Sequence, residues 1–217
     1  MTEHKSMNSI IHDAFRRDLR RFDVALADPG AANPQRADQL SVAWDNFAKQ
    51  LHDHHEDEEN IFWPAVRSLG VDTTLAGELE SEHAQMLTAL DKATAAMQSY
   101  RTFPSADSAG GARISVGELA AVLTSHLDHE EADLDPFAAE HEDSSQMKNA
   151  QKAVRRAHRG NTGTFFAWLL DGASDADARG LRETIPPPVL AMIVRIGGRN
   201  YRRTVAPTWR GKASPAG

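Results

Sequence analysis

Two stretches of the sequence carry the same pattern of histidine, glutamate and proline. Both residues 54–64 and residues 126–136 read H-x-x-x-E-E-x-x-x-x-P. Four residues turn an α-helix by about 400°, so each histidine and the first glutamate after it lie within about 40° of each other. One imidazole and one carboxylate on each of two helices form a donor set that suits a metal cluster held between helices.

Four long helical patterns must position these donors. We expect helices over about residues 6–28, 36–68, 72–101 and 112–140, with a loop over 102–111. Asp28-Pro29-Gly30 ends the first helix and Gly70 follows the second, whose last turn Pro64 should kink. No alternation typical of β-strands occurs. The short connections favour antiparallel neighbours, so the sequence predicts an all-α, up-down four-helix bundle.

The candidate donors stand on the apolar seams of these helices, where residues recur at steps of three and four. The seams read His12, Phe15, Leu19, Phe22, Leu26; then Leu40, Trp44, Phe47, Leu51, His54, Glu58, Ile61, Ala65; then Ala76, Leu79, His83, Met86, Leu90, Ala93, Met97; and Val116, Leu119, Leu123, His126, Glu130, Asp133, Phe137. Burying charged groups without partners costs several kcal/mol each. A cation satisfies their lone pairs and removes that cost.

The donor types restrict the metal. The chain contains no cysteine, so thiolate sites and disulfides are excluded. Imidazole and carboxylate donors suit iron, manganese or zinc. Four histidines and two glutamates are too many for one tetrahedral zinc ion. Two carboxylates can bridge a pair of cations that the imidazoles cap, with positions left open. We infer two non-haem, carboxylate-bridged iron ions, with manganese or zinc as alternatives.

Residues 1–140 resemble the hemerythrin-like, HHE-domain proteins of the bacterial type. That family takes one histidine from the first helix, H-x-x-x-E from the second, one histidine from the third, and a histidine and a carboxylate from the fourth. The resemblance implies six metal ligands, which are His12, His54, Glu58, His83, His126 and Glu130. One turn after His83, where oxygen-carrying hemerythrins have a second histidine, this chain has Leu87. The resemblance therefore implies sensing, iron handling, or peroxide or nitric oxide chemistry rather than oxygen transport.

Several polar neighbours have a second interpretation. Three further histidines are expected in solvent or beside the ligands rather than on the metal, namely His52, His55 and His129. Glu56 would reach the metal only in an altered register, and Glu82 is placed to orient a ligand ring by a hydrogen bond. A ferritin-like di-iron site needs two E-x-x-H pairs; only Glu80 with His83 fits, which excludes that class.

The charge is unevenly distributed between a bundle domain (residues 1–141) and an extension (residues 142–217). Residues 1–144 hold 27 acidic and 11 basic side chains (−16), whereas residues 145–217 hold 4 and 13 (+9), which sums to the net charge of −7. We expect the basic helical extension to pack on its own bundle or on a second subunit through Phe165, Trp168 and Trp209. It contains no nucleic-acid motif, so we do not expect it to bind nucleic acid.

The sequence favours one function and leaves two alternatives open. The first is a di-iron protein that binds or reacts with oxygen, peroxide or nitric oxide as a sensor or protective factor. The second is an iron-storage or iron-sensing module without turnover. The third is a peroxide-disproportionating, catalase-like enzyme with Glu56, Glu59 or Tyr201 as acid–base candidates. Without a signal-peptide pattern or an apolar run of about 18 residues, the predicted location is the cytoplasm.

Overall fold

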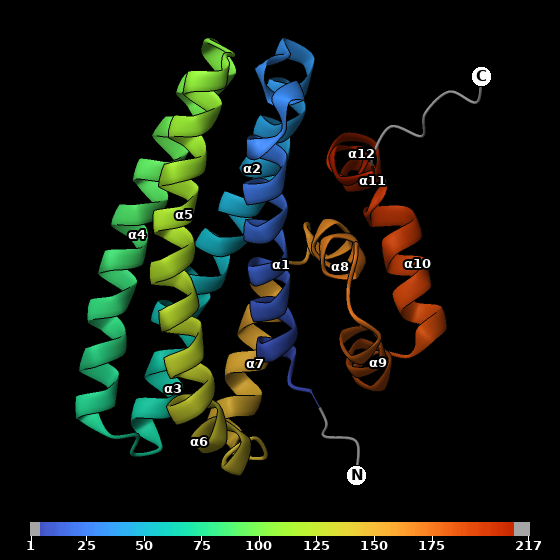
Figure 1. Cartoon of the computed structure of the whole chain (residues 1–217). Helices are drawn as coiled ribbons and strands as arrows, with labels where there is room; N and C mark the ends of the chain where they lie inside the picture. Colours follow the sequence, from blue (N-terminus) through green and yellow to red (C-terminus); the bar gives the residue numbers. More distant parts are fainter. Residues whose placement is uncertain (1–4, 211–217) are drawn as a thin grey trace.

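The computed structural model describes residues 5–210, and every regular element in that range is helical (Figure 1). The bundle consists of α1 (Met7–Ala27), α2 (Pro34–Asp57) continued by α3 (Trp63–Ser68), α4 (Thr73–Thr102), and α5 (Ala106–His129) continued by α6 (Asp135–Glu140). Helix α5 packs on α1 and α4, and α2 packs on α1 and α4, so the four rods close into a ring. The predicted all-α bundle is confirmed.

Side-chain caps fix where the long helices begin. Ser6, Asn33 and Asp72 each accept a backbone N–H from the first turn of the helix that follows. The expected loop over 102–111 is wrong in its second half, because α5 already begins at Ala106. There Ser105 and Ser108 exchange hydrogen bonds in a capping box. This cap offsets the poor helix propensity of the two glycines that follow, each about 1 kcal/mol worse than alanine.

A five-residue π-helical turn interrupts each of the two repeated motifs. The turns are η2 (Glu58–Phe62) and η3 (Glu130–Leu134). In each, the glutamate carbonyl accepts the N–H of the residue five positions later, immediately before the motif's proline. Pro64 therefore lies just after a π turn, and the helix continues through this turn into α3. We had expected Pro64 to kink the last turn of one long helix.

These π turns shift the buried face of the helices that follow them. A π turn accommodates one extra residue, so positions beyond it rotate relative to the α-helical register. The predicted seam residues Ile61 and Ala65 are only partly buried, and Asp133 is exposed. The structure buries Trp63, Val66 and Leu134 instead. Before the π turns, the predicted apolar seam residues are all buried.

The chain after residue 141 forms short helices beside the bundle. They are α7 (Ser145–Ala157), α8 (Thr162–Leu170), α9 (Asp175–Thr184), α10 (Pro187–Gly197), α11 (Arg199–Thr204) and α12 (Ala206–Trp209). In Figure 1, α8 lies between α1 and α10. Helices α8 and α10 approach closely at Gly163, where a Cβ atom would lie only 2.2 Å from the Gly197 Cα. Among residues 5–210, no helix is long and apolar enough to cross a bilayer.

Aromatic residues join the extension to the bundle. The ring of Trp168 lies 5.2 Å from that of Phe15, and the ring of Trp209 lies 5.0 Å from that of Phe22. Phe165, the third predicted contact, packs on Trp168 within the extension. Residues of the bundle and of the extension belong to the same hydrophobic core. The division into residues 1–141 and 142–217 stays a prediction from charge and helix length.

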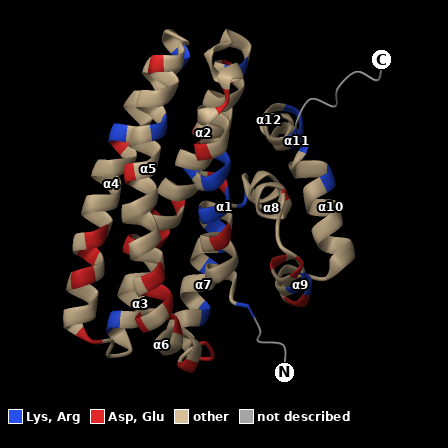
Figure 2. Cartoon of the chain, in the orientation of Figure 1, with Lys and Arg blue, Asp and Glu red and all other residues tan. Residues whose placement is uncertain are grey.

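Two ion pairs between the bundle and the extension run opposite to the extension's net charge, whereas His158, just after α7, lies 2.7 Å from Asp57 of α2 in the sense that this charge favours. Arg17 of α1 donates to backbone carbonyls in the last turn of α8, and Arg21 donates to the carbonyl of Asp171 just after α8 and lies near its carboxylate. Lys5 pairs with Asp177 of α9. The Lys and Arg residues of α7 and α11 are exposed, and Figure 2 marks such positions along the ribbon in blue. The extension therefore folds back on the bundle through its aromatic, acidic and carbonyl groups.

A buried hydrogen bond anchors α8 to α1 and provides a stability test. Trp168 Nε1 donates to Asp18 Oδ2 at 2.7 Å, and both side chains are buried. Trp168→Phe keeps an aromatic ring but leaves this oxygen without its donor, so we expect the free energy of unfolding to fall by about 1–3 kcal/mol. Trp209→Phe is the control, because its Nε1 has no partner among the described residues. Equal losses in urea unfolding would contradict the anchor.

Candidate metal centre

The six predicted donors meet inside the bundle, together with one histidine that the sequence had placed elsewhere. The donors come from every rod: His12 from α1, His54 and His55 from α2, Glu58 from η2, His83 from α4, His126 from α5 and Glu130 from η3. All are buried except His54, whose side chain retains 11% exposure. The structure thus brings together all four helices of the bundle at one polar centre.

The donor atoms form two groups that share one residue. One group is His12, His54, Glu58 and Glu130, and the other is His55, Glu58, His83 and His126; within each, the donor atoms lie within 4.8 Å of one another. The two oxygens of Glu58 face different groups. Oε1 lies 3.0 Å from His54 Nε2, and Oε2 lies 3.5 Å from His83 Nε2. A carboxylate in this position is suited to bridge two cations.

Hydrogen bonds around the centre orient three of the imidazole rings. His12 Nδ1 lies 2.8 Å from Glu131 Oε1, and His126 Nδ1 lies 3.0 Å from Glu82 Oε2. His55 Nδ1 lies 2.9 Å from the Leu51 carbonyl. Because each partner is an acceptor, each Nδ1 carries the hydrogen, and each Nε2 presents a lone pair to the centre. Such outer contacts fix the ring orientation of metal-binding histidines.

The carboxylates that hold the rings are themselves anchored. Burial raises the pKa of Glu131, but hydrogen bonds from His12 and Arg16 outweigh it and lower that pKa to about 2. Glu82 also accepts from His129 Nδ1 at 2.9 Å, and this bond raises the pKa of His129. Both acceptors therefore stay ionised at neutral pH. The predicted role of Glu82 is supported, although it orients His126 rather than its neighbour His83.

Burial shifts the pKa values of the donors in two directions. Desolvation, together with the neighbouring imidazoles, lowers the pKa of His54 and His55 well below the usual value and that of His83 to about 4. Desolvation and mutual proximity raise the pKa of Glu58, and desolvation raises that of Glu130. These three imidazoles are therefore neutral and able to donate lone pairs near pH 7. The same burial makes the two carboxyl groups hold a proton to a higher pH than an exposed glutamate does, so a cation competes with protons for their oxygens over a wider pH range.

Several donor atoms have no hydrogen-bond partner within residues 5–210. They are His55 Nε2, Glu58 Oε2 and Glu130 Oε2, all of which are buried. Opposing nitrogens also face each other, with His12 Nε2 3.3 Å from His54 Nε2 and His83 Nε2 3.2 Å from His126 Nε2. Buried polar groups normally have partners. Cations between these atoms would satisfy the lone pairs, so the donor set fits a metal centre of nitrogen and oxygen ligands.

The structure excludes the solvent position that was one of the two places expected for His55. His55 is 3% exposed and belongs to the donor cluster, where we had expected solvent or a position beside the ligands. The sequence of α2 contained a signal for this position. His55 belongs to a second row of residues spaced by three, four or seven positions, and all of them are buried: Ala37, Ser41, Trp44, Leu51 and His55.

The remaining candidates lie outside the cluster. His52 and Glu56 are exposed and adjacent to each other on the surface of α2. Glu59 is half exposed, with its Oε1 3.8 Å from His83 Nδ1. Tyr201 donates its hydroxyl hydrogen to Asp171 in the extension. Of the three acid–base candidates, the structure places only Glu59 next to a donor residue.

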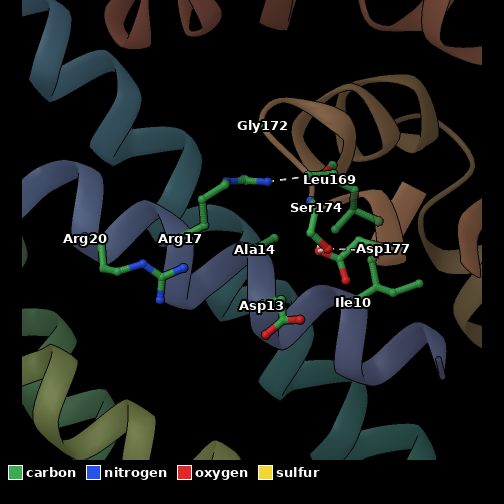
Figure 3. A pocket seen from close by; sticks show the side chains of 10 residues that line it. Ile10, Asp13, Ala14, Arg17, Arg20, Leu169, Gly172, Ser174 and Asp177 are labelled. Atoms are coloured by element: carbon green, nitrogen blue, oxygen red, sulfur yellow. Dashed lines mark hydrogen bonds between the residues drawn. The ribbon is translucent and has the colours of Figure 1, made fainter. Parts of the chain in front are cut away.

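A separate recess lies where α1 meets the segment between α8 and α9 (Figure 3). Arg17 crosses it to donate to the Leu169 carbonyl, and Ser174 and Asp177 hydrogen-bond each other on its far side. None of the seven donor residues lines this recess. It belongs to the contact between the bundle and the extension, and the donor cluster lies in the bundle interior.

Comparison with known proteins agrees with this geometry. Residues 10–138 match the family model described as the hemerythrin HHE cation-binding domain, and this range includes all seven donors. No curated protein and no solved structure matches the chain. The match covers more than half of the 217 residues. The chain belongs to the hemerythrin HHE cation-binding domain family.

Proposed function

We propose that this protein holds two non-haem iron ions and binds or reacts with small oxidants as a sensor or protective factor. The observation that carries the proposal is the pair of donor groups that share Glu58. His12, His54 and Glu130 would hold one ion, and His83 and His126 the other, with Glu58 between them. Iron in such a centre supplies a change of oxidation state and open positions for a small ligand.

The surroundings of the donors support a small, uncharged reactant. Phe15 lies beside His54, with ring centroids 5.5 Å apart, and the ring of Trp168 lies 5.2 Å from that of Phe15. Leu51 and Met86 are fully buried nearby on the two helices that carry His54 and His83. This apolar surrounding excludes bulk water and larger polar substrates. Oxygen, nitric oxide and hydrogen peroxide are small enough and carry no charge.

Ferrous iron titration under argon, followed by exposure to air, tests the proposal. We expect two iron ions per chain and, after oxidation, absorption near the ultraviolet edge that is typical of an oxo-bridged pair. Binding of one ion, or of none, would contradict the two-ion centre. Two bound ions whose spectrum does not change with air, peroxide or nitric oxide would exclude oxidant chemistry and favour iron storage or iron sensing.

Peroxide addition separates the enzymatic alternative. A catalase-like protein would release oxygen steadily from hydrogen peroxide in proportion to its iron content, whereas a sensor would react once. Glu59 is the acid–base candidate that lies next to a donor, since its Oε1 is 3.8 Å from His83 Nδ1. If oxygen release is steady and Glu59→Gln reduces its rate without loss of iron, the enzyme replaces the sensor as the proposed function.

The hydrogen bond from Glu82 to His126 should contribute to metal affinity. Glu82→Gln keeps the size of the side chain but weakens its acceptor, so we expect iron affinity to fall about 10–100-fold. Glu78→Gln is the matched control, since Glu78 lies on the same helix, is exposed, and has its recorded ionic contact with His129, at 3.9 Å. Competition with a coloured chelator measures both variants. Equal affinities for the two variants would show that Glu82 does not orient the ring.

A further inference from the structure

We propose that His55 is a metal ligand whose Nε2 atom supplies the fifth imidazole of the centre, in place of the histidine absent at position 87. The inference rests on the proposed two-ion centre and assigns a residue that the family pattern of six ligands omits. It is carried by the burial of His55, by the unpartnered state of its Nε2, and by its position among three other donors.

The position of the ring is that of a donor. His55 lies with its ring centroid 4.6 Å from that of His83 and 5.4 Å from that of His126. The interplanar angle with His83 is 82°, so the two rings meet edge to face rather than in a stack. Together with Glu58, the three histidines place one donor atom each within 4.8 Å of one another. A single cation among them would contact all four residues.

The other nitrogen of His55 is already used. Nδ1 donates to the Leu51 carbonyl one turn earlier at 2.9 Å, which fixes the tautomer and leaves a lone pair on Nε2. A histidine buried only for packing would need an N–H or O–H donor at that nitrogen. Within residues 5–210 there is none, because Nε2 is buried and has no hydrogen-bond partner. A cation suits this lone pair, and the other donor atoms that surround it suit the same cation.

Adjacent positions on α2 allow one helix to serve both ions. Consecutive residues of an α-helix point about 100° apart, so the rings of His54 and His55 diverge. Their centroids are 5.2 Å apart, and each ring belongs to a different donor group. Glu58, one turn later, faces both groups. At position 87 the chain has a partly buried leucine that packs on the core, so α4 contributes His83 alone.

The assignment makes the two metal positions unequal. The group of His55, His83 and His126 has three imidazoles, whereas the group of His12 and His54 has two imidazoles and the carboxylate of Glu130. Loss of His55 should therefore weaken one position and leave the other with all its donors. Loss of a histidine that belongs to neither donor group should leave both metal positions unchanged.

Iron stoichiometry of full-length His55→Ala, with His52→Ala as control, tests the inference. His52 lies on the same helix, but its side chain is 62% exposed. For His55→Ala, we expect one tightly bound ion and a second bound at least about 100-fold more weakly. The Mössbauer spectrum should then lose the signal of one of two coupled iron sites. His52→Ala should match the unmodified protein in both measurements.

The outcomes separate this inference from the function on which it rests. If the unmodified protein does not bind two ions, the proposed function fails first. If it binds two, and His55→Ala binds two with unchanged affinity and spectrum, only the role of His55 is overturned. If His55→Ala does not fold, His55→Leu replaces it, because leucine fills most of the same space and has no donor atom. The same loss of one ion is then expected, and two tightly bound ions would overturn the inference.

Discussion

Replacing Glu58 with alanine should abolish the binding of both cations. Glu58 is the residue that the two donor groups share, and its two oxygens face His54 on one side and His83 on the other. Without it, each group loses a negatively charged donor, and the two positions lose the carboxylate between them. We expect less than 0.1 iron ion per chain after gel filtration, which corresponds to affinity losses of at least about 1,000-fold.

Glu59→Ala is the matched control for this prediction. Glu59 is the next residue of the same motif and carries the same charge, but its side chain is 51% exposed. It should keep two ions per chain. Circular dichroism must show that both variants remain helical, so that loss of iron is not loss of fold. Retention of one tightly bound ion by Glu58→Ala would show that the groups do not share a bridging carboxylate.

The bundle itself was predictable because its signal is repeated over many residues. Steps of three and four along each helix identified the seams, and residues such as Phe15, Phe47, Leu119 and Leu123 are buried as expected. The same signal selected the six candidate donors, since polar residues on an apolar seam need a shared partner, and the structure brings these residues together. Turn residues such as Pro29 marked the ends of the helices within a few positions.

The π turns explain most of what the sequence did not reveal. Local propensity does not distinguish an α turn from a π turn, so the seam after Glu58 was extended in the wrong register. The correct face there contains Trp63 and Val66. The position of His55 was missed for a related reason. The sequence analysis assigned one narrow a/d seam to α2. In the structure α2 packs on both α1 and α4, so its buried face is wider than one seam, and His55 lies on the side that faces α4.

The contacts of the extension could not be obtained from its net charge. Net charge does not identify which side chains meet, and the decisive contacts involve few residues. Trp168 meets the buried carboxylate of Asp18, and Arg17 and Arg21 bind backbone carbonyls that no sequence pattern reveals. The sequence identified the aromatic residues that dock, while the sign of the ionic contacts had to come from the structure.

Removal of the metal should destabilise the protein, and the size of that effect should depend on pH. A ligand at 1,000 times its dissociation constant stabilises the folded state by about 4 kcal/mol. For a chain of this size, that corresponds to a melting temperature lower by roughly 8–16 °C after chelation. Thermal unfolding with and without EDTA at pH 7.5 and pH 5.5 measures the difference. Glu58→Ala should show no response to EDTA at either pH.

The loss of melting temperature on adding EDTA should become smaller as the pH falls. The direction of this change follows from the two carboxyl groups. Burial raises the pKa of Glu58 and Glu130, so protons compete with the cation for these oxygens over a range above their usual titration. The same protons favour the metal-free folded state over the unfolded chain as the pH falls toward 4.5.

The histidines have the opposite effect on the stability of the metal-free protein, which they lower as the pH falls. The pKa of His83 is about 4 in the folded state, whereas an unfolded histidine takes up a proton near pH 6.5. Stability of the metal-free protein from this residue is therefore complete above pH 6.5 and is lost as the pH falls toward 4. Protons compete with the cation for the oxygens of Glu58 and Glu130, so cation affinity falls as the pH falls, and the stabilisation by metal should still decrease on acidification. A larger EDTA effect at pH 5.5 than at pH 7.5 would show that the two glutamates are ionised before the metal arrives.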